Sequence, residues 1–278
     1  MQLDSEKLKQ IIDSSLQEDI GGGDITSQLT IPENSVIKAD FVTREACIIA
    51  GIPVLEQIFM KESGRVTFMP LVREGDEVSA QTIIFTVEGN ARIILAFERV
   101  ALNLLQYMCG IATITRKFTK EVSHTKAKIL DTRKITPNLR MLAKYAVWMG
   151  GGKNHRFGLS DGILIKDNHI AICGDIEKAI LAAKKSAPKN MKIEVECDNL
   201  EQVEKAVNCG ADIIMLDNMN TETLKKAVHI NAGRAILEAS GGVNLTTVKA
   251  IAETGVDYIS VGALTHSAPS IDIGLDIK

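Results

Sequence analysis

Hydrophobic and polar positions follow two different rhythms along the chain. Apolar residues recur at helical spacing over residues 8–16 and predict a surface helix near the amino terminus. Residues 37–87 carry short apolar runs separated by glycines, which predicts strands joined by turns. An apolar stripe over residues 92–108 predicts a further helix. The pattern changes near residue 110, where we expect a second domain to begin.

After residue 110, strand-like apolar runs alternate with helical segments. The runs cover residues 127–132, 161–168, 192–197, 211–218, 234–241 and 256–262. The helical segments lie near residues 137–149, 175–186, 199–208, 221–229 and 245–253. Apolar runs of this kind are typical of parallel strands that helices cover. Six such units in succession predict an α/β fold with a parallel α/β barrel.

Composition narrows the range of partners. The chain has 278 residues, 45% of them hydrophobic, and a net charge of −3, so there is no basic excess for binding nucleic acid. We identify no signal peptide and no apolar segment of membrane-spanning length, and we expect no membrane partner. The five cysteines are scattered without a CxxC pair, which favours free thiols in the cytoplasm over a metal site or disulfides.

Polar residues follow the predicted strands at their carboxyl ends. These ends converge on one face of a parallel barrel, and that face is where active sites are built. A single acid such as Glu196 or Asp217 is more often a helix cap, but polar groups at six strand ends together indicate a site. The residues are Asp131, Thr132, Arg133, Lys134, Lys166, Asp167, Asn168, His169, Glu196, Asp217, Asn218, Ser240, Gly241, Gly242 and Gly262.

Basic residues gather in one short part of an otherwise acidic chain, which predicts a small ligand with several negative charges. They are Arg133, Lys134, Lys153, His155, Arg156 and Lys166, with Arg140 and Lys144 on the intervening helix. Arg140 and Lys144 also fit a solvated helix face. Lys166 does not, because it lies in an apolar run where an unpaired charge is costly. The run GGGKNHRFG offers backbone N–H groups to phosphate, or simply ends a helix.

The acidic and glycine-containing strand ends complete this ligand site. Glu196 and Asp217 could hold Mg²⁺ that accompanies a pyrophosphate, bind ribose hydroxyls or stabilise a developing cation. Ser240-Gly241-Gly242 and Ser260-Val261-Gly262 follow the last two strands, where barrels of this kind bind phosphate.

Several stretches, read in order, resemble the quinolinate phosphoribosyltransferases from about Glu18 to the end of the chain. They are EDIGGGDITS, ERVALNLLQYMCGIAT, LDTRKITPNLR, GGGKNHRFGLSDGILIKDNHI, IEVECDN, IMLDN and LEASGGVN. The usual family run is TRKTTPGLR, and here Ile135 and Asn138 replace its second threonine and its glycine. The loss of that hydroxyl leaves fine details of substrate contact open.

The resemblance implies an incomplete parallel α/β barrel at residues 111–266 and a smaller α/β sandwich domain at residues 1–110. Residues 267–278 are expected to belong to the smaller domain. The resemblance also implies a homodimer with shared active sites, in which Arg99 reaches the neighbouring subunit's quinolinate. The substrates would be quinolinate and phosphoribosyl pyrophosphate (PRPP), with Mg²⁺. The implied site residues are Arg133, His155 and Arg156 for quinolinate, Lys134 and Lys166 near pyrophosphate and the reacting carbon, Glu196 and Asp217 at ribose and metal, and Ser240, Gly241, Gly262 and His266 for the 5′-phosphate.

Two other functions compete with this one. A paralogue of the same fold, found beside molybdate transport genes, acts on a different anionic substrate, but Arg99 and Arg156 favour quinolinate. Residues 64–89 also resemble a biotinyl or lipoyl carrier domain. Such a carrier needs a lysine at a hairpin tip, and the turn expected around Met69-Pro70 has none. It would also leave the barrel unexplained.

Overall fold

The computed structural model describes residues 1–278, which divide into two compact units. Unit 1 contains residues 1–116, 136–151 and 267–278, and unit 2 contains residues 117–135 and 152–266. The chain therefore leaves unit 2 after its first strand and returns after one helix. The carboxyl-terminal segment falls in the unit of the amino terminus, and residues 136–151 do not belong to the unit that holds the parallel sheet.

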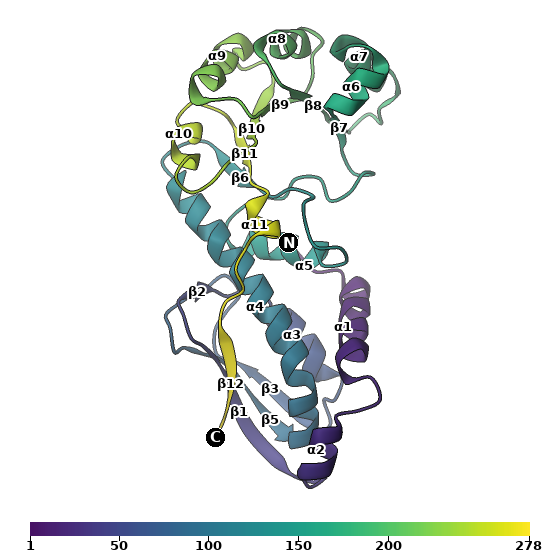
Figure 1. The fold of residues 1–278 in the computed structure, drawn as a ribbon, viewed down its shortest axis with the longest axis vertical. Coiled ribbons are helices and arrows are strands. Elements are labelled where there is room, and N and C mark those ends of the chain that lie inside the picture. The colour runs from purple at the N-terminus through teal and green to yellow at the C-terminus, as the bar shows by residue number, and fades with distance from the viewer. The chain divides into compact units, whose positions relative to one another are not determined.

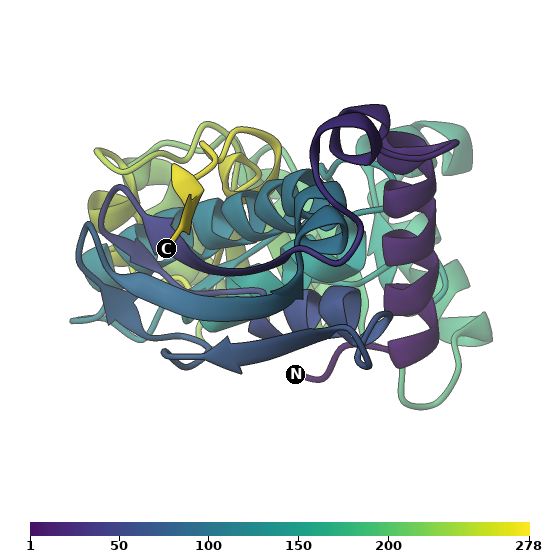
Figure 2. The same cartoon turned by 90° about the horizontal axis from the view of Figure 1, so that it is seen from below.

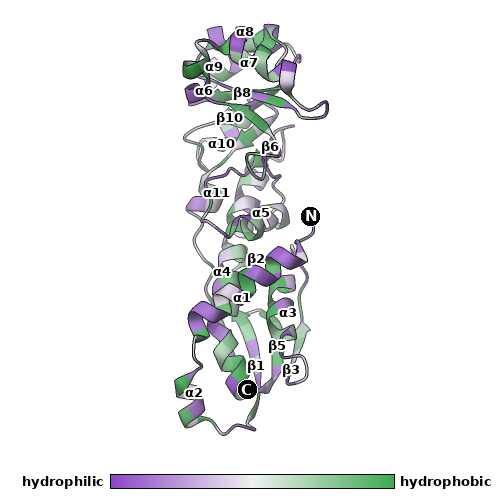
Figure 3. Ribbon diagram, turned by 90° about the vertical axis from the view of Figure 1, so that its right-hand side faces the viewer, coloured by the Kyte–Doolittle hydropathy of each residue, from purple (hydrophilic) through white to green (hydrophobic).

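Unit 1 is built on an antiparallel sheet in the order β12-β1-β5-β3, with a separate pair β2-β4. Helix α3 packs on β3, and α1 contacts α3 (Figures 1 and 2). Figure 3 shows mainly hydrophobic residues along β5 and mixed turns on α1. The elements are α1 (Ser5–Ile20), α2 (Ile25–Thr30), β1 (Val36–Thr43), β2 (Cys47–Ile48), α3 (Ile52–Met60), β3 (Val66–Pro70), β4 (Glu77–Val78), β5 (Ile83–Asn90), α4 (Ala91–Glu121), α5 (Arg140–Met149) and β12 (Ile273–Ile277).

The sequence pattern missed helix α3, because the helix begins with help from a distant residue. Gly51 precedes it with φ of 120°, and no local side chain caps it. Instead, Glu74 Oε1 accepts the backbone N–H groups of Gly51 and Ile52 at 2.8 and 2.6 Å. A carboxylate at a helix amino terminus satisfies N–H groups that the helix itself leaves open.

Helix α4 is longer than expected, since it continues to Glu121 through Gly110. A Cβ on Gly110 would clash with the carbonyl oxygen of Pro269, so this glycine allows a close approach and does not end the helix. The expectation that no segment reaches membrane-spanning length was therefore wrong for α4. Its most apolar part is long enough to cross a membrane by length and composition, but half of that part is buried inside the protein, as in a core helix.

Lys144 on α5 corrects a second expectation. It is 1% exposed, so it does not belong to a solvated helix face. The turn expected around Met69-Pro70 is also misplaced, because both residues belong to strand β3.

Unit 2 holds six parallel strands in the order β6-β11-β10-β9-β8-β7. The sheet curves with helices α7 to α10 on its outer side (Figure 1). β6 and β7 do not pair with each other, so the barrel is incomplete, as predicted. The elements are β6 (Lys128–Leu130), β7 (Ile163–Ile165), α6 (Asp167–Cys173), α7 (Ile176–Ser186), β8 (Ile193–Cys197), α8 (Leu200–Asn208), β9 (Ile213–Asp217), α9 (Thr221–Asn231), β10 (Ile236–Ser240), α10 (Val248–Ala252), β11 (Tyr258–Ser260) and α11 (Ala263–His266).

Polar side chains fix both ends of these strands. Asp175, Asn199 and Asn220 cap α7, α8 and α9 by accepting N–H groups of the first helical turn. At the opposite ends, Asp212 accepts the N–H of Ile193, and Asp257 accepts that of Leu237. These contacts set the strand ends at which the polar residues gather.

Candidate active site

A cavity of about 590 Å³ opens at the carboxyl ends of the parallel strands. Most of the site residues predicted from the sequence line it. They are Thr132, Arg133, Lys134, His155, Arg156, Lys166, Glu196, Asp217, Asn218, Ser240, Gly241, Gly242 and Ser260, and the cavity is also lined by Leu164 and Met215. Arg99 is an exposed residue of α4 in unit 1, whereas all the residues that line the cavity belong to unit 2.

The loop that carries His155 and Arg156 is tied to strand β6. Lys153 forms a parallel bridge with Leu130, and its carbonyl accepts the N–H of Asp131 at 3.2 Å. The fully buried Asp131 carboxylate accepts the backbone N–H of His155 at 2.9 Å and the side-chain amide of Asn154 at 2.5 Å. The loop thus extends the open edge of the barrel and directs two predicted ligand residues into the cavity.

Two arginines concentrate positive charge on one wall. Arg156 Nη1 donates to the carbonyl of Gly162 at 3.0 Å, and its buried Nε has no hydrogen-bond partner. Burial, and then the charge of Arg133, lower the pKa of Arg156. The charges of Glu194 and Asp161 act in the opposite direction but do not cancel this shift, so this wall is suited to an anionic ligand.

Two acids also line this cavity. Glu196 is 9% exposed and forms an ion pair with Lys166. The expectation that Lys166 is buried was wrong, because its side chain is 45% exposed. Asp217 Oδ2 accepts the side-chain amide of Asn218 at 2.6 Å. Each acid already has a partner, and each still faces the cavity with carboxylate oxygens of the kind that Mg²⁺ and ribose hydroxyls bind.

Glycines shape the end of the cavity formed by β10 and β11. Gly241 has φ of 92°, and a Cβ there would clash with Asn218 Oδ1. A Cβ on Gly262 would lie 3.2 Å from the His266 ring and 3.3 Å from Lys134 Cδ. Gly262 therefore brings His266 and Lys134 together, although neither it nor His266 lines the cavity.

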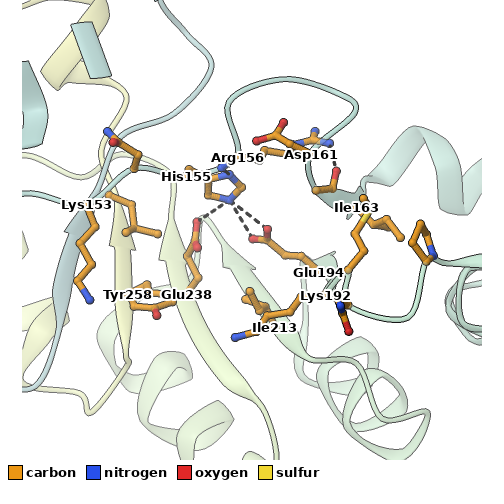
Figure 4. Close-up of a pocket in the computed structure, with 16 residues that line it drawn as sticks. Lys153, His155, Arg156, Asp161, Ile163, Lys192, Glu194, Ile213, Glu238 and Tyr258 are labelled. Atoms are coloured by element: carbon orange, nitrogen blue, oxygen red, sulfur yellow. Dashed lines mark hydrogen bonds and ion pairs between the residues drawn. The ribbon is translucent and has the colours of Figure 1, made fainter. Parts of the chain in front are cut away.

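Sequence reasoning missed two buried acids, Glu194 on β8 and Glu238 on β10. They are 4% and 1% exposed and point toward His155, as Figure 4 shows. His155 Nε2 lies 3.0 Å from Glu194 Oε2 and 3.6 Å from Glu238 Oε1. Strand alternation could have found both, because Glu194 precedes Glu196 by two residues and Glu238 precedes Ser240 by two.

The acids Glu194 and Glu238 also line a second cavity, of about 560 Å³. It lies toward the amino ends of the strands, where Ile163, Ile213 and Tyr258 begin β7, β9 and β11. His155 and Arg156 line both cavities, so these two residues form part of the wall that the cavities share.

Comparison with known proteins covers nearly the whole chain. Residues 24–109 and 111–276 match the amino- and carboxyl-terminal domain models of quinolinate phosphoribosyl transferase. The chain belongs to the quinolinate phosphoribosyl transferase family. A probable carboxylating nicotinate-nucleotide pyrophosphorylase of Bacillus subtilis is 43% identical, over 98% of this chain and 93% of the relative. The Mycobacterium leprae enzyme is 44% identical, over 95% and 94%. The structure of the Ehrlichia chaffeensis pyrophosphorylase matches all of both chains with a TM-score of 0.95 and 46% identity.

Family membership confirms the resemblance and the fold class predicted from the sequence. It also gives the two departures a structural setting. Asn138 has φ of 69°, in the left-handed region that glycine and then asparagine tolerate best, so it suits the position of the usual glycine. Ile135 does not line the cavity, so the missing threonine hydroxyl removes no group from its lining.

Proposed function

We propose that the chain transfers the phosphoribosyl group of PRPP to the nitrogen of quinolinate and removes one carboxylate, giving nicotinate mononucleotide, pyrophosphate and carbon dioxide. The observation that carries this proposal is one cavity lined by two arginines and two acids, in a chain of this family. The name of the relatives, carboxylating nicotinate-nucleotide pyrophosphorylase, describes the same interconversion in reverse. The reaction belongs to the biosynthesis of NAD.

Quinolinate is assigned to the wall formed by Arg133, His155 and Arg156. Its two carboxylates match in number the two neighbouring guanidinium groups that line the cavity. Nicotinate has only one carboxylate and would leave one guanidinium group unpaired. The cost should lie near the lower end of the about 2–5 kcal/mol of a truncated charge pair, because Arg156 is part-buried and Arg133 is exposed. We therefore expect kcat/KM for nicotinate to be at least about thirtyfold below that for quinolinate. Similar values for the two acids would contradict this assignment.

PRPP is assigned to the rest of the cavity. Ser240, Gly241, Gly242, Ser260, Gly262 and His266 would hold the 5′-phosphate, and Lys134 and Lys166 the pyrophosphate. Glu196 and Asp217 would bind ribose hydroxyls and the Mg²⁺ that accompanies pyrophosphate. Their fit to Mg²⁺ rests on two carboxylates facing one cavity, with room for the waters that this ion retains.

The proposed reaction needs no strong base. The pyridine nitrogen displaces pyrophosphate from the ribosyl carbon through a cationic transition state, so positioning and electrostatics dominate. The carboxylates of Glu196 and Asp217 stabilise the developing positive charge, and Lys134 and Lys166 stabilise the leaving pyrophosphate. The ribosylated nitrogen is then positively charged and stabilises the carbanion left when the adjacent carboxylate departs as carbon dioxide. A proton from the site's water completes nicotinate mononucleotide.

We further propose that two chains form a homodimer with shared active sites, in which Arg99 serves the neighbour's site. Support comes from the family resemblance and from the exposure of Arg99 on α4. An equal mixture of inactive Arg99→Ala and Glu196→Ala chains should regain about a quarter of wild-type activity after random exchange, because one site of each mixed dimer carries neither defect. If exchange is confirmed and the mixture stays inactive, Arg99 serves its own chain.

The cytoplasmic location is also part of the proposal, supported by five cysteines without a disulfide. The alternative, a paralogue acting on another anion, is less well supported, because the relatives named above are carboxylating pyrophosphorylases. Competition between quinolinate and other anionic heterocycles distinguishes the two. The proposed enzyme should prefer quinolinate, and a clear preference for another heterocycle would favour the paralogue.

A further inference from the structure

The mechanism above leaves two buried acids without a role. Glu194 and Glu238 approach the same imidazole edge of His155 from two different strands (Figure 4). Ligand atoms of the three residues lie within 4.8 Å of one another. The grouping could be a metal site, a charged triad or a support for the histidine, and the hydrogen bonds of His155 distinguish these possibilities.

The other ring nitrogen of His155 fixes the position of its proton. The backbone N–H of Arg156 donates to His155 Nδ1 at 2.8 Å, so Nδ1 acts as an acceptor and carries no proton. The single ring proton is then on Nε2, where it faces the Glu194 carboxylate at 3.0–3.3 Å. Metal binding at Nε2 would require the proton to move to Nδ1, against the Arg156 N–H. In an imidazolium, the N–H at Nδ1 would point directly at the backbone N–H of Arg156.

Glu194 and Glu238 accept hydrogen bonds from different donors. Glu194 accepts the N–H of His155, whereas Glu238 Oε1 accepts the hydroxyl of Ser260 and lies farther from His155. Burial, and then the charge of Glu194, raise the pKa of Glu238 to about 7, while the hydrogen bond from Ser260 acts in the opposite direction. Glu238 is therefore the acid of the pair that retains its proton to higher pH.

We propose that Glu194 and Glu238 are positioning residues, which hold His155 as a neutral ring with its proton on Nε2 and thereby fix one wall of the quinolinate pocket. This inference rests on the proposed function for the ligand. It changes the role of His155, which the sequence grouped with the cations. Its ring becomes a rigid neutral surface, and the binding of the carboxylates falls to Arg133 and Arg156. Because His155 also lines the second cavity, its fixed ring helps to separate that cavity from the substrate.

Kinetics of two variants at one position test this role. Glu194→Ala removes the acceptor for His155, and Glu194→Gln keeps an acceptor oxygen without the charge. We expect the KM for quinolinate to rise about tenfold in Glu194→Ala and no more than about threefold in Glu194→Gln, with the KM for PRPP within about twofold in both. Glu204→Gln, at an exposed position of α8, is the matched control and should behave as wild type. Equal effects of the two Glu194 variants, or equal changes in both KM values, would overturn the proposal.

Glu238→Gln provides a pH arm, since the amide imitates the protonated acid. The charged or hydrogen-bonding groups around Glu238 are Glu194, Asp131, His155 and Ser260. They are the same in the wild type and in Glu238→Gln, so any pH dependence that they cause should appear in both proteins. We expect the wild-type KM for quinolinate to rise between about pH 6.5 and about pH 8.5, as Glu238 ionises beside the anion site. The variant should lack this rise. The same rise in both proteins would contradict the role of Glu238.

A spectroscopic arm separates this inference from the proposed function. The side-chain ¹⁵N signals of His155, assigned by their loss in His155→Gln, should be those of a neutral ring protonated on Nε2 near pH 7 in the ligand-free protein. Glu194→Ala should disturb that pattern, and Glu194→Gln should preserve it. An imidazolium or an Nδ1-protonated ring in the wild type would overturn the inference, whatever the substrate. If the ¹⁵N pattern is as expected but the protein forms no nicotinate mononucleotide, only the proposed function is overturned.

Discussion

The pairing of Glu194 with Glu238 should make the stability of the protein depend on pH in a defined direction. The pKa of Glu238 is raised from its ordinary value of 4.5 to about 7, first by burial and then by the charge of Glu194. Between these two pH values the folded protein holds a proton that the unfolded chain has released. Stability from this group is therefore complete below about pH 4.5 and falls as the pH rises to about 7.

The size of this effect follows from the shift. About 2.5 pH units at about 1.4 kcal/mol per unit correspond to a loss on the order of 3 kcal/mol. Glu238→Gln removes the titration, so the stability of the variant relative to wild type should increase by on the order of 3 kcal/mol between about pH 4.5 and about pH 8. Urea unfolding followed by circular dichroism at several pH values measures this difference directly.

Glu204→Gln is again the control, because Glu204 is an exposed residue of α8. Its stability difference from wild type should stay nearly constant over the same pH range. If the difference between Glu238→Gln and wild type is also constant, Glu238 does not retain a proton in the folded state. That result would refute the reasoning about the buried acid pair.

The remaining predictions concern the cavity at the carboxyl ends of the strands. Glu196→Ala and Asp217→Ala should each lower kcat by at least about a hundredfold with circular dichroism unchanged, because each removes a carboxylate that faces the ligand; near wild-type kcat with saturating PRPP and Mg²⁺ would show that the assigned role is wrong. Gly241→Ala should raise the KM for PRPP by at least about tenfold, because the new Cβ would clash with Asn218 Oδ1 at the proposed phosphate site. Gly174→Ala, which has a similar φ of 96° but no heavy atom within 4 Å of the new Cβ, should lose stability without this change in KM. An equal rise in both glycine variants would contradict the phosphate assignment.

Much of the fold could be predicted from the sequence, because the parallel strands are short and mainly apolar and alternate with periodic helical segments. All six runs after residue 110 became strands, and the periodic segments between them became helices. The misses have long-range causes. Helix α3 depends on Glu74, more than twenty residues away in the chain, and α4 passes through Gly110 because Pro269 approaches it. No local pattern reports such contacts.

The candidate site was predictable where chemistry coincides with strand ends. Glu196 and Asp217 sit at such ends and line one cavity, together with the basic residues of the following loops. The neutral state of His155 was not predictable, because it depends on the backbone N–H of Arg156 and on Glu194 from another strand. The burial of Lys144 was missed for a similar reason, since one sequence does not show which face of a basic helix is covered.

The central claim is that quinolinate gains a bond from its nitrogen to the ribosyl carbon and loses the carboxylate at carbon 2. The most direct measurement uses quinolinate labelled in the carboxylate at carbon 2, next to the nitrogen, with PRPP and Mg²⁺. We predict that the label appears entirely as carbon dioxide, in equal amounts with nicotinate mononucleotide and pyrophosphate, and that label in the carboxylate at carbon 3 stays in the nucleotide. No release of label, or a nucleotide that keeps both carboxylates, would contradict the account.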